Sequence, residues 1–152
     1  MPDIVLLDSG PLGLVSARPG SPARDQCRLW IGVLLARRVK VVVPEIADYE
    51  VRRELTRLRA FPSIRRLDEL VTLGGLSYAP VTTTEWHQAA LFWADARARG
   101  LPTASQDALD ADVILAASAT TIGQPGDQVI VATTNVGHLA RYCDARLWTS
   151  IT

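Results

Sequence analysis

The chain alternates between short, continuous apolar runs and longer segments in which apolar residues recur every three or four positions. The run at 4–7 shows no polar alternation, which is typical of a strand covered on both faces of a parallel sheet. The β-branched run at 39–44, closed by a proline, and the run at 128–133 also predict strands. The longer segments between them have helical spacing. Because both kinds of segment alternate along the whole chain, the pattern predicts a three-layer α/β/α sandwich around a central, mostly parallel β-sheet.

Turn and cap residues set the expected boundaries of the elements. Ser63 and Thr84 have the residue type that caps helices, and a proline near the end of the run at 76–81 predicts an edge strand. Residues 9–11 read as a turn and residues 16–22 as a loop. The expected helices cover 27–35, 45–59, 63–73, 84–100, a segment from 107 or 110 to about 123, and 135–142, with a loop at 101–107 and a last strand at 146–151.

Composition limits the size and the environment of the protein. A chain of 152 residues with 48% hydrophobic content fits one domain, residues 1–152, with a full core. The 16 basic and 16 acidic residues cancel, which excludes a long-range field for coating nucleic acid or a membrane surface. Cys27 and Cys143 have no metal-type spacing and read as free thiols. No apolar run reaches the length of a membrane span, so we expect a cytoplasmic protein with no membrane partner.

Asp8 directly follows the first apolar run, at the predicted carboxyl end of a central strand. Ligands and metals gather outside the carboxyl ends of the strands in open α/β sheets, so this position predicts a functional acid. The alternative is that Asp8 only caps the turn at 9–11, because aspartate is common in turns.

Glu50 lies in the opening turns of the helix that follows the second predicted strand. It would face the same edge of the sheet as Asp8. Glu54, Arg53 and Arg57 lie at helical spacing around it, so a solvated face of ion pairs is the competing interpretation.

Three acids, Asp107, Asp110 and Asp112, open a later helix. The helix dipole and capping explain one or two of them. Asp112 shares a helix face with Leu115 and Ala116 and should point inward, where an unpaired carboxylate is costly. A divalent metal ion would supply the missing partner.

The run at 128–133 leads into Thr134 and Asn135, which either cap the next helix or orient a metal-bound water beside Asp8. Oxygen ligands without His or Cys are those that Mg²⁺ or Mn²⁺ prefers. Such ions activate water and polarise phosphoryl groups, so phosphodiester hydrolysis is the natural chemistry of this set.

Taken in order, Asp8, the YEVRREL segment with Glu50, the DVILAA segment with Asp112 and the TTNVGHL segment with Asn135 resemble the PIN domains, especially the VapC-type toxins of bacterial toxin–antitoxin systems. The resemblance implies an α/β/α sandwich, a Mg²⁺- or Mn²⁺-dependent ribonuclease that cuts RNA, and an antitoxin partner. It assigns Asp8, Glu50 and Asp112 as metal ligands and Asn135 as a fourth catalytic residue. The fourth position is often Asp but also Asn in the family. Asn135 lowers the charge available for a second ion, so one bound ion is the expectation for the free protein.

The resemblance leaves the roles of Glu45, Asp107, Asp110 and Thr134 open. A phosphatase of the haloacid dehalogenase type would need a second aspartate at the position of Gly10, which argues against that class. The remaining alternative is a catalytically inactive PIN-like module that binds protein or RNA.

Other residues are expected to have ordinary roles. His87 and His138 are too few for a histidine-based site, and His87 should lie on a helix surface. The four tryptophans are expected in the core or at an interface rather than as platforms for nucleic-acid bases. Because a twofold pair is the commonest oligomer, we expect a homodimer in the complex with the antitoxin.

Overall fold

The computed structural model describes the backbone of residues 1–100 and 106–152, and side chains of residues 1–100 and 110–152. Most of the loop expected at 101–107 therefore lies outside the described residues, as does the side chain of Asp107. Within the described part of the chain, no helix is long and apolar enough to cross a membrane.

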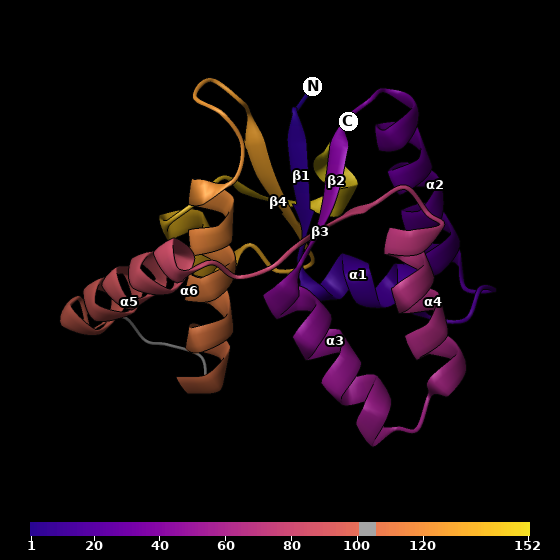
Figure 1. Cartoon of the computed structure of the whole chain (residues 1–152), viewed down its shortest axis with the longest axis horizontal. Coiled ribbons are helices and arrows are strands. Elements are labelled where there is room, and N and C mark those ends of the chain that lie inside the picture. Colours follow the sequence, from indigo (N-terminus) through magenta and orange to yellow (C-terminus); the bar gives the residue numbers. More distant parts are fainter. Residues whose placement is uncertain (101–105) are drawn as a thin grey trace.

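A single sheet of five parallel strands forms the centre of the molecule (Figure 1). The strand order is β3-β2-β1-β4-β5, and all four neighbouring pairs are parallel, as the sequence predicts. The short strand β3 lies at one edge, which confirms the interpretation of the proline at its end. The strands are β1 (Ile4–Leu7), β2 (Lys40–Pro44), β3 (Ser77–Ala79), β4 (Val129–Thr133) and β5 (Ala145–Leu147).

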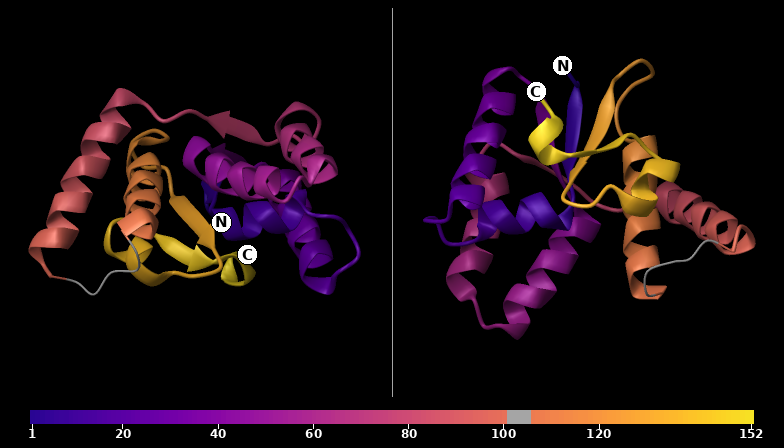
Figure 2. Two further views of the ribbon diagram at one scale, coloured as in Figure 1. Left: turned by 90° about the horizontal axis from the view of Figure 1, so that it is seen from below. Right: turned by 180° about the vertical axis from the view of Figure 1, so that it is seen from behind.

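Helices cover both faces of the sheet and complete the predicted three-layer α/β/α sandwich (Figure 2). Helices α1 to α4 pack on one face, and α6 packs on the other, with α5 lying outside α6. The helices are α1 (Ser9–Ser16), α2 (Pro22–Ala36), α3 (Glu45–Arg57), α4 (Phe61–Thr72), α5 (Thr83–Ala98) and α6 (Gln106–Thr121), and two 3₁₀ turns are η1 (Gly137–Arg141) and η2 (Trp148–Ser150).

The central strand β1 is buried along its whole length because each face meets a separate apolar cluster. Val5 and Leu7 pack against the layer of α1 to α4, whereas Ile4 and Leu6 pack against the layer of α6. A strand in this position needs apolar side chains at every residue, which explains the uninterrupted run in the sequence.

The turn expected at residues 9–11 is the first turn of α1 instead. Asp8 caps this helix, and its side chain accepts a hydrogen bond from the Ser9 backbone N–H at 2.7 Å. Pro11 is tolerated because the first-turn N–H groups of a helix have no partner inside the helix. The same sequence is therefore compatible with a turn or a capped helix, and burial of Leu12 and Val15 favours the helix.

Two predicted caps are wrong by a few residues. Helix α4 begins at Phe61 after Ala60, so Ser63 lies inside its first turn. Helix α5 is capped by Thr82 rather than Thr84, and the Thr82 hydroxyl accepts a hydrogen bond from the Glu85 N–H. Three consecutive threonines offer three possible caps, and local sequence does not distinguish them.

The carboxyl-terminal segment differs most from expectation. The helix expected at 135–142 is the 3₁₀ turn η1, and the strand expected at 146–151 ends at Leu147. The chain turns there because Trp148 packs against Trp30, with ring centroids 5.5 Å apart, and the Trp30 indole N–H donates to the Ile151 carbonyl at 2.9 Å. These two tryptophans have the core role that the sequence predicts.

Candidate metal centre at the carboxyl edge of the sheet

Asp8 follows β1 at the carboxyl edge of the sheet, between its two neighbours β2 and β4. One carboxylate oxygen, Oδ1, accepts the Ser9 N–H, and the other, Oδ2, accepts the Thr133 hydroxyl at 2.7 Å. Asp8 therefore caps α1, as the competing interpretation holds, and also has its second oxygen fixed by the neighbouring strand. The cap alone does not account for this second contact.

Thr133 is a residue of the site that the sequence analysis missed. It is fully buried at the end of β4, and its hydroxyl oxygen also accepts a hydrogen bond from the Asn135 N–H at 3.0 Å. The register of the sheet places Ala132 opposite Leu7, so Thr133 comes one step later, opposite Asp8. A hydroxyl at the last position of a buried strand could have indicated Thr133, but only once the pairing of β1 with β4 is known.

Glu50 lies half-buried on α3, and its carboxyl has a pKa raised to about 7. Burial is the main cause, the charge of Asp8 adds to it, Arg53 opposes it, and the charge of Asp112 adds a smaller part. Like charges raise a carboxyl pKa only over short separations, so the carboxylates of Asp8, Glu50 and Asp112 act on one another.

The ion-pair face that competed with this interpretation exists, but Glu50 is not part of it. Arg57 pairs with Glu54, one helical turn beyond Glu50. Arg53 lies over the ring of Tyr49, with its guanidinium carbon 5.2 Å from the ring centroid. Neither arginine forms an ion pair with Glu50 within the described part of the chain.

Asp112 lies half-buried on α6, as its helix face predicts, and has a pKa raised to about 6. Burial is again the main cause and Asp8 is the next, while His138 lowers the value. Asp8, Glu50 and Asp112 thus come from the central strand and from helices on the two opposite layers.

The Asn135 backbone N–H donates to the Thr133 hydroxyl, and the Asn135 side chain, the predicted fourth catalytic group, is exposed beside the site. Thr134 lies against α1, where a β-carbon at position 10 would be 2.6 Å from the Thr134 Cγ2 atom. Gly10 therefore permits the close approach of α1 to the end of β4. This approach brings Asp8 and Thr133 within hydrogen-bonding distance.

The remaining acids have simpler surroundings. Glu45 accepts hydrogen bonds from the Tyr78 hydroxyl and the Val81 N–H, both at 3.1 Å, so it joins the start of α3 to the segment around β3. Asp110 is exposed. His87 is exposed on α5 as predicted, and both cysteines are free thiols.

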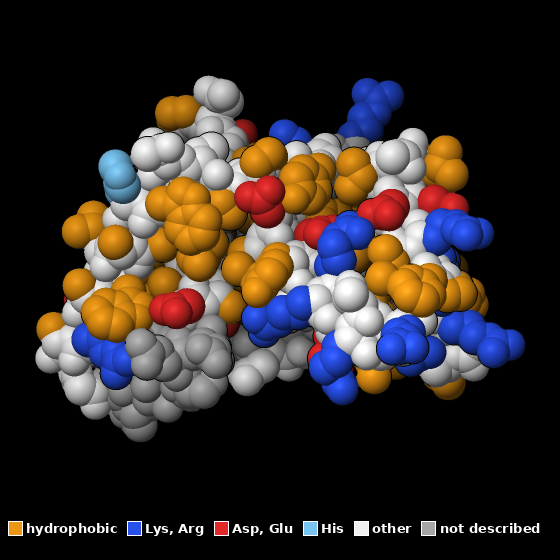
Figure 3. Space-filling view, turned by 60° about the horizontal axis from the view of Figure 1, so that its bottom comes forward, with side chains coloured by type: hydrophobic (Ala, Val, Ile, Leu, Met, Phe, Trp, Pro, Cys, Tyr) orange, Lys and Arg blue, Asp and Glu red, His pale blue; other side chains and the backbone are white. Residues whose placement is uncertain are grey.

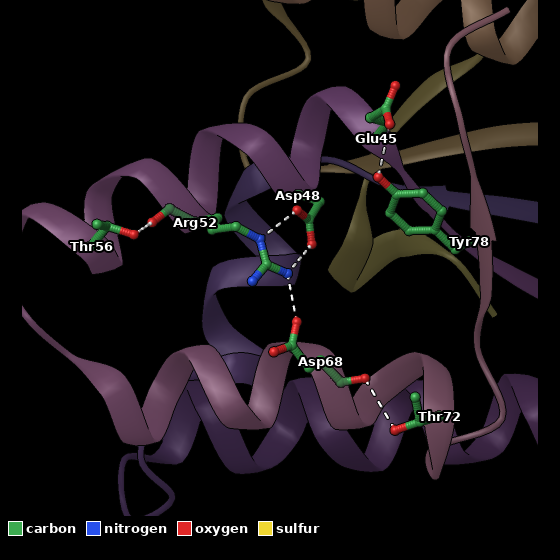
Figure 4. Close-up of polar contacts among 7 residues, drawn as sticks. All are labelled: Glu45, Asp48, Arg52, Thr56, Asp68, Thr72 and Tyr78. Atoms are coloured by element: carbon green, nitrogen blue, oxygen red, sulfur yellow. Dashed lines mark hydrogen bonds and ion pairs between the residues drawn. The ribbon is translucent and has the colours of Figure 1, made fainter.

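A network of ion pairs fixes α3, the helix that carries Glu50 (Figure 4). The Arg52 guanidinium bridges Asp48 on its own helix and Asp68 on α4, at 2.9 Å and 2.6 Å. Together with the contacts of Glu45, this network ties α3 to both α4 and β3. The position of Glu50 relative to Asp8 therefore depends on contacts away from the site itself.

The donor set fits a hard divalent cation. Asp8, Glu50 and Asp112 offer only oxygen atoms, and none of them has an ion-pair partner among the residues that the structure describes. In the described part of the chain, no three acidic, histidine or cysteine side chains lie close enough together to hold a metal ion between them. Mg²⁺ is usually held by one or two carboxylates and keeps several waters, so an open arrangement of acids suits it.

Comparison with known proteins adds information about the fold. No family model and no curated protein matches the sequence. Among solved structures, the chain is similar to VapBC2 from Rickettsia felis, bound to a promoter DNA fragment, with a TM-score of 0.69, 14% identity and coverage of 95% of this chain and 98% of that chain.

Two further structures give the same result. VapBC-1 from nontypeable Haemophilus influenzae matches with a TM-score of 0.68 and 16% identity over 97% of this chain and 99% of that chain. FitAcB from Neisseria gonorrhoeae matches with a TM-score of 0.63 and 20% identity, over the same shares of the two chains. These likenesses show that the chain has the fold found in VapBC and FitAB complexes over nearly its whole length.

Proposed function

We propose that this protein is a Mg²⁺- or Mn²⁺-dependent endoribonuclease and the toxin of a toxin–antitoxin pair. The observation that carries the proposal is the set of three carboxylates, Asp8, Glu50 and Asp112, at the carboxyl edge of the sheet. Their charges act on one another, and no cation of the described chain pairs with them. The fold shared with VapBC and FitAB complexes supports the same conclusion.

In this proposal Asp8, Glu50 and Asp112 would hold the ion, which would supply activation of water and polarisation of the scissile phosphodiester. Asp8 is oriented by the Ser9 N–H and the Thr133 hydroxyl, so it is the most firmly placed of the three. Because burial raises its pKa to about 7, the Glu50 carboxyl keeps its proton to a much higher pH than an exposed glutamate in the ion-free protein. Ion binding therefore releases this proton from the Glu50 carboxyl.

The same acids offer a site for an inhibitory partner. An arginine or lysine of an antitoxin would meet three carboxylates that have no ion-pair partner among the described residues, and such charge-assisted hydrogen bonds are strong. The apolar side chains of the antitoxin would cover exposed surface on the helices near Glu50. We propose an antitoxin partner and a homodimer of this chain within the complex.

Growth and cleavage assays test the proposal. Expression of this chain alone should arrest growth, while Asp112→Ala, or co-expression of an antitoxin encoded beside it, should relieve the arrest. Glu54→Gln is the control variant and should still arrest growth, because it also removes one acidic charge but at a position outside the site. Glu54 lies on the same helix as Glu50, is exposed and pairs with Arg57. The purified chain should cut RNA with Mn²⁺ and lose this activity with a chelator.

A harmless wild-type chain that leaves varied RNAs intact in the presence of Mn²⁺ would refute the nuclease proposal. The catalytically inactive binding module would then be the better description. The R. felis structure contains a DNA fragment from a promoter, so a role within a DNA-bound complex is the form that such a module would take.

A further inference from the structure

A pocket with a volume of about 480 Å³ opens directly beside Glu50, between α3, α5 and α6. Its lining includes the aliphatic side chains of Ile46, Val81 and Ile114. It continues past Trp86 and Ile114 into a second hollow between α5 and α6, which Trp93 also lines. Figure 3 looks toward this end of the sheet and shows hydrophobic side chains gathered over the half of the molecule that holds α5 and α6, while most Lys and Arg side chains lie over the other half, which holds α1 to α4.

Two aromatic rings line the pocket from opposite helices. Tyr49 on α3 is 56% exposed and Trp86 on α5 is 51% exposed, although both are large enough to fill a core position. Arg53 lies over the Tyr49 ring, 5.2 Å from its centroid, and lines the same pocket. Trp86 is therefore not a core residue like Trp148, and its ring is available to a ligand.

The charges around the pocket select the kind of group that it can take. The residues that line the pocket include three acids, Glu45, Glu50 and Asp110, and one cation, Arg53. A phosphate group would be repelled by this excess of negative charge, whereas a flat, uncharged ring would not be. Purine and pyrimidine bases have such a ring, and aromatic side chains bind bases by stacking with little dependence on sequence.

We propose that this pocket binds one base of the RNA strand, next to the phosphate that lies at the acids, by stacking on Trp86 and Tyr49. The inference rests on the proposed nuclease function and names the part of the substrate that determines where the strand is held. The base enters the pocket while its phosphate stays outside, toward the acids and their ion. Arg53 covers the Tyr49 ring and holds it in place at the rim.

Binding measured without cleavage tests this directly. In the Asp8→Asn background, a short fluorescent RNA should bind with roughly tenfold lower affinity when Trp86→Ala or Tyr49→Ala is added, a change equal to about 1.4 kcal/mol. Phe61→Ala is the matched control, because Phe61 is an aromatic residue 63% exposed on α4 that does not line the pocket. It should bind RNA as the parent does.

RNAs with a single abasic position identify the base. One abasic position should weaken binding to the parent about tenfold and leave the Trp86→Ala variant almost unaffected, because both changes remove the same contact. Equal losses for every abasic position, or additive losses in the variant, would overturn the proposal. Circular dichroism and melting temperature verify the fold, and Trp86→Leu replaces Trp86→Ala if the latter is unfolded.

The cleavage assay separates this inference from the proposed function. In the active enzyme, which keeps Asp8, Trp86→Ala should raise KM and alter the preferred cleavage positions. Phe61→Ala should change neither. An active wild-type enzyme whose KM and cleavage positions are the same in Trp86→Ala would refute the base pocket but not the nuclease. Loss of antitoxin affinity in Trp86→Ala with unchanged RNA binding would assign the pocket to the protein partner and also overturn the inference.

Discussion

Replacing Glu50 by glutamine should stabilise the ion-free protein at pH 8 and leave its stability at pH 5 nearly unchanged. The Glu50 carboxyl has a pKa raised from 4.5 to about 7 in the folded chain, mainly by burial. Between these two values the folded state keeps a proton that the unfolded state has released. The free energy of unfolding therefore falls as the pH rises from about 4.5 to about 7, and the full cost is present above pH 7.

The size of the effect follows from the shift. A change from 4.5 to about 7 corresponds to at most about 3–4 kcal/mol, at about 1.36 kcal/mol per pKa unit. Glu50 is half-buried, so water screens part of this cost, and glutamine must itself be partly desolvated. We expect a gain of about 1–2 kcal/mol at pH 8, which raises the melting temperature of a chain of this size by roughly 2–8 °C.

Thermal melts in the presence of a chelator at pH 5 and pH 8 measure this difference. Glu54→Gln is the control, because Glu54 is exposed on the same helix and the Arg57 hydrogen bond lowers its pKa. Glu54→Gln should give no gain at pH 8. Mn²⁺ should raise the melting temperature of the wild-type chain at pH 8 more than that of Glu50→Gln, since binding to the folded state stabilises it.

Equal pH dependence of stability in the wild-type chain and Glu50→Gln would refute the reasoning, because it would mean that Glu50 ionises without cost. A gain in Glu54→Gln as large as that in Glu50→Gln would also refute it. The benefit would then come from general charge reduction on α3 rather than from the acid cluster.

Three further outcomes are expected. Asp8→Asn should abolish RNA cleavage yet melt, without metal, no lower than the wild-type chain, because asparagine caps helices as well as aspartate does; a sharp drop in melting temperature would show that Asp8 is mainly structural. Thr133→Val should lower kcat and should also lower the free energy of unfolding by about 1–3 kcal/mol. Thr133→Ser keeps the hydroxyl and should retain both the activity and the stability. Mn²⁺ affinity measured by calorimetry should fall from pH 8 to pH 5.5, as protons occupy Glu50 and Asp112; a constant affinity would contradict their role as ligands.

The strands that carry the site were predictable because their environment leaves a strong mark on the sequence. β1, β2 and β4 are buried on both faces, so each requires a continuous apolar run. The end of such a run marks the carboxyl edge of the sheet to within about one residue. Asp8 could be placed at this edge for that reason alone.

Helix α1 was not predictable in the same way, because residues 9–11 have the composition of a turn. Its stability comes from contacts with distant parts of the chain. Leu12 and Val15 are buried in the core of the α1-to-α4 layer, and Gly10 meets Thr134 beyond β4. Local propensity is a weak guide where tertiary packing of this kind decides the conformation.

The role of Thr133 depends on strand pairing that no local pattern contains. Its hydroxyl reaches Asp8 only because β4 pairs with β1 in the register that sets Ala132 opposite Leu7. A shift of one residue would turn the Thr133 side chain to the other face of the sheet. The sequence therefore indicated the strand that carries Thr133 but not the hydrogen bond that it makes.

The three acids differ in how the fold treats them, and this difference determines how the site should respond to a cation. Both oxygens of Asp8 are held by hydrogen bonds, whereas no hydrogen bond reaches the carboxylates of Glu50 or Asp112 within the described residues. Burial raises the pKa of both of these carboxyls instead. Because Glu50 and Asp112 belong to helices on opposite layers of the sandwich, a cation that draws both toward Asp8 would join the two layers through the central strand. Its binding energy would then become stability of the whole fold, and an antitoxin arginine or lysine placed there would stabilise the chain in the same way while blocking the site.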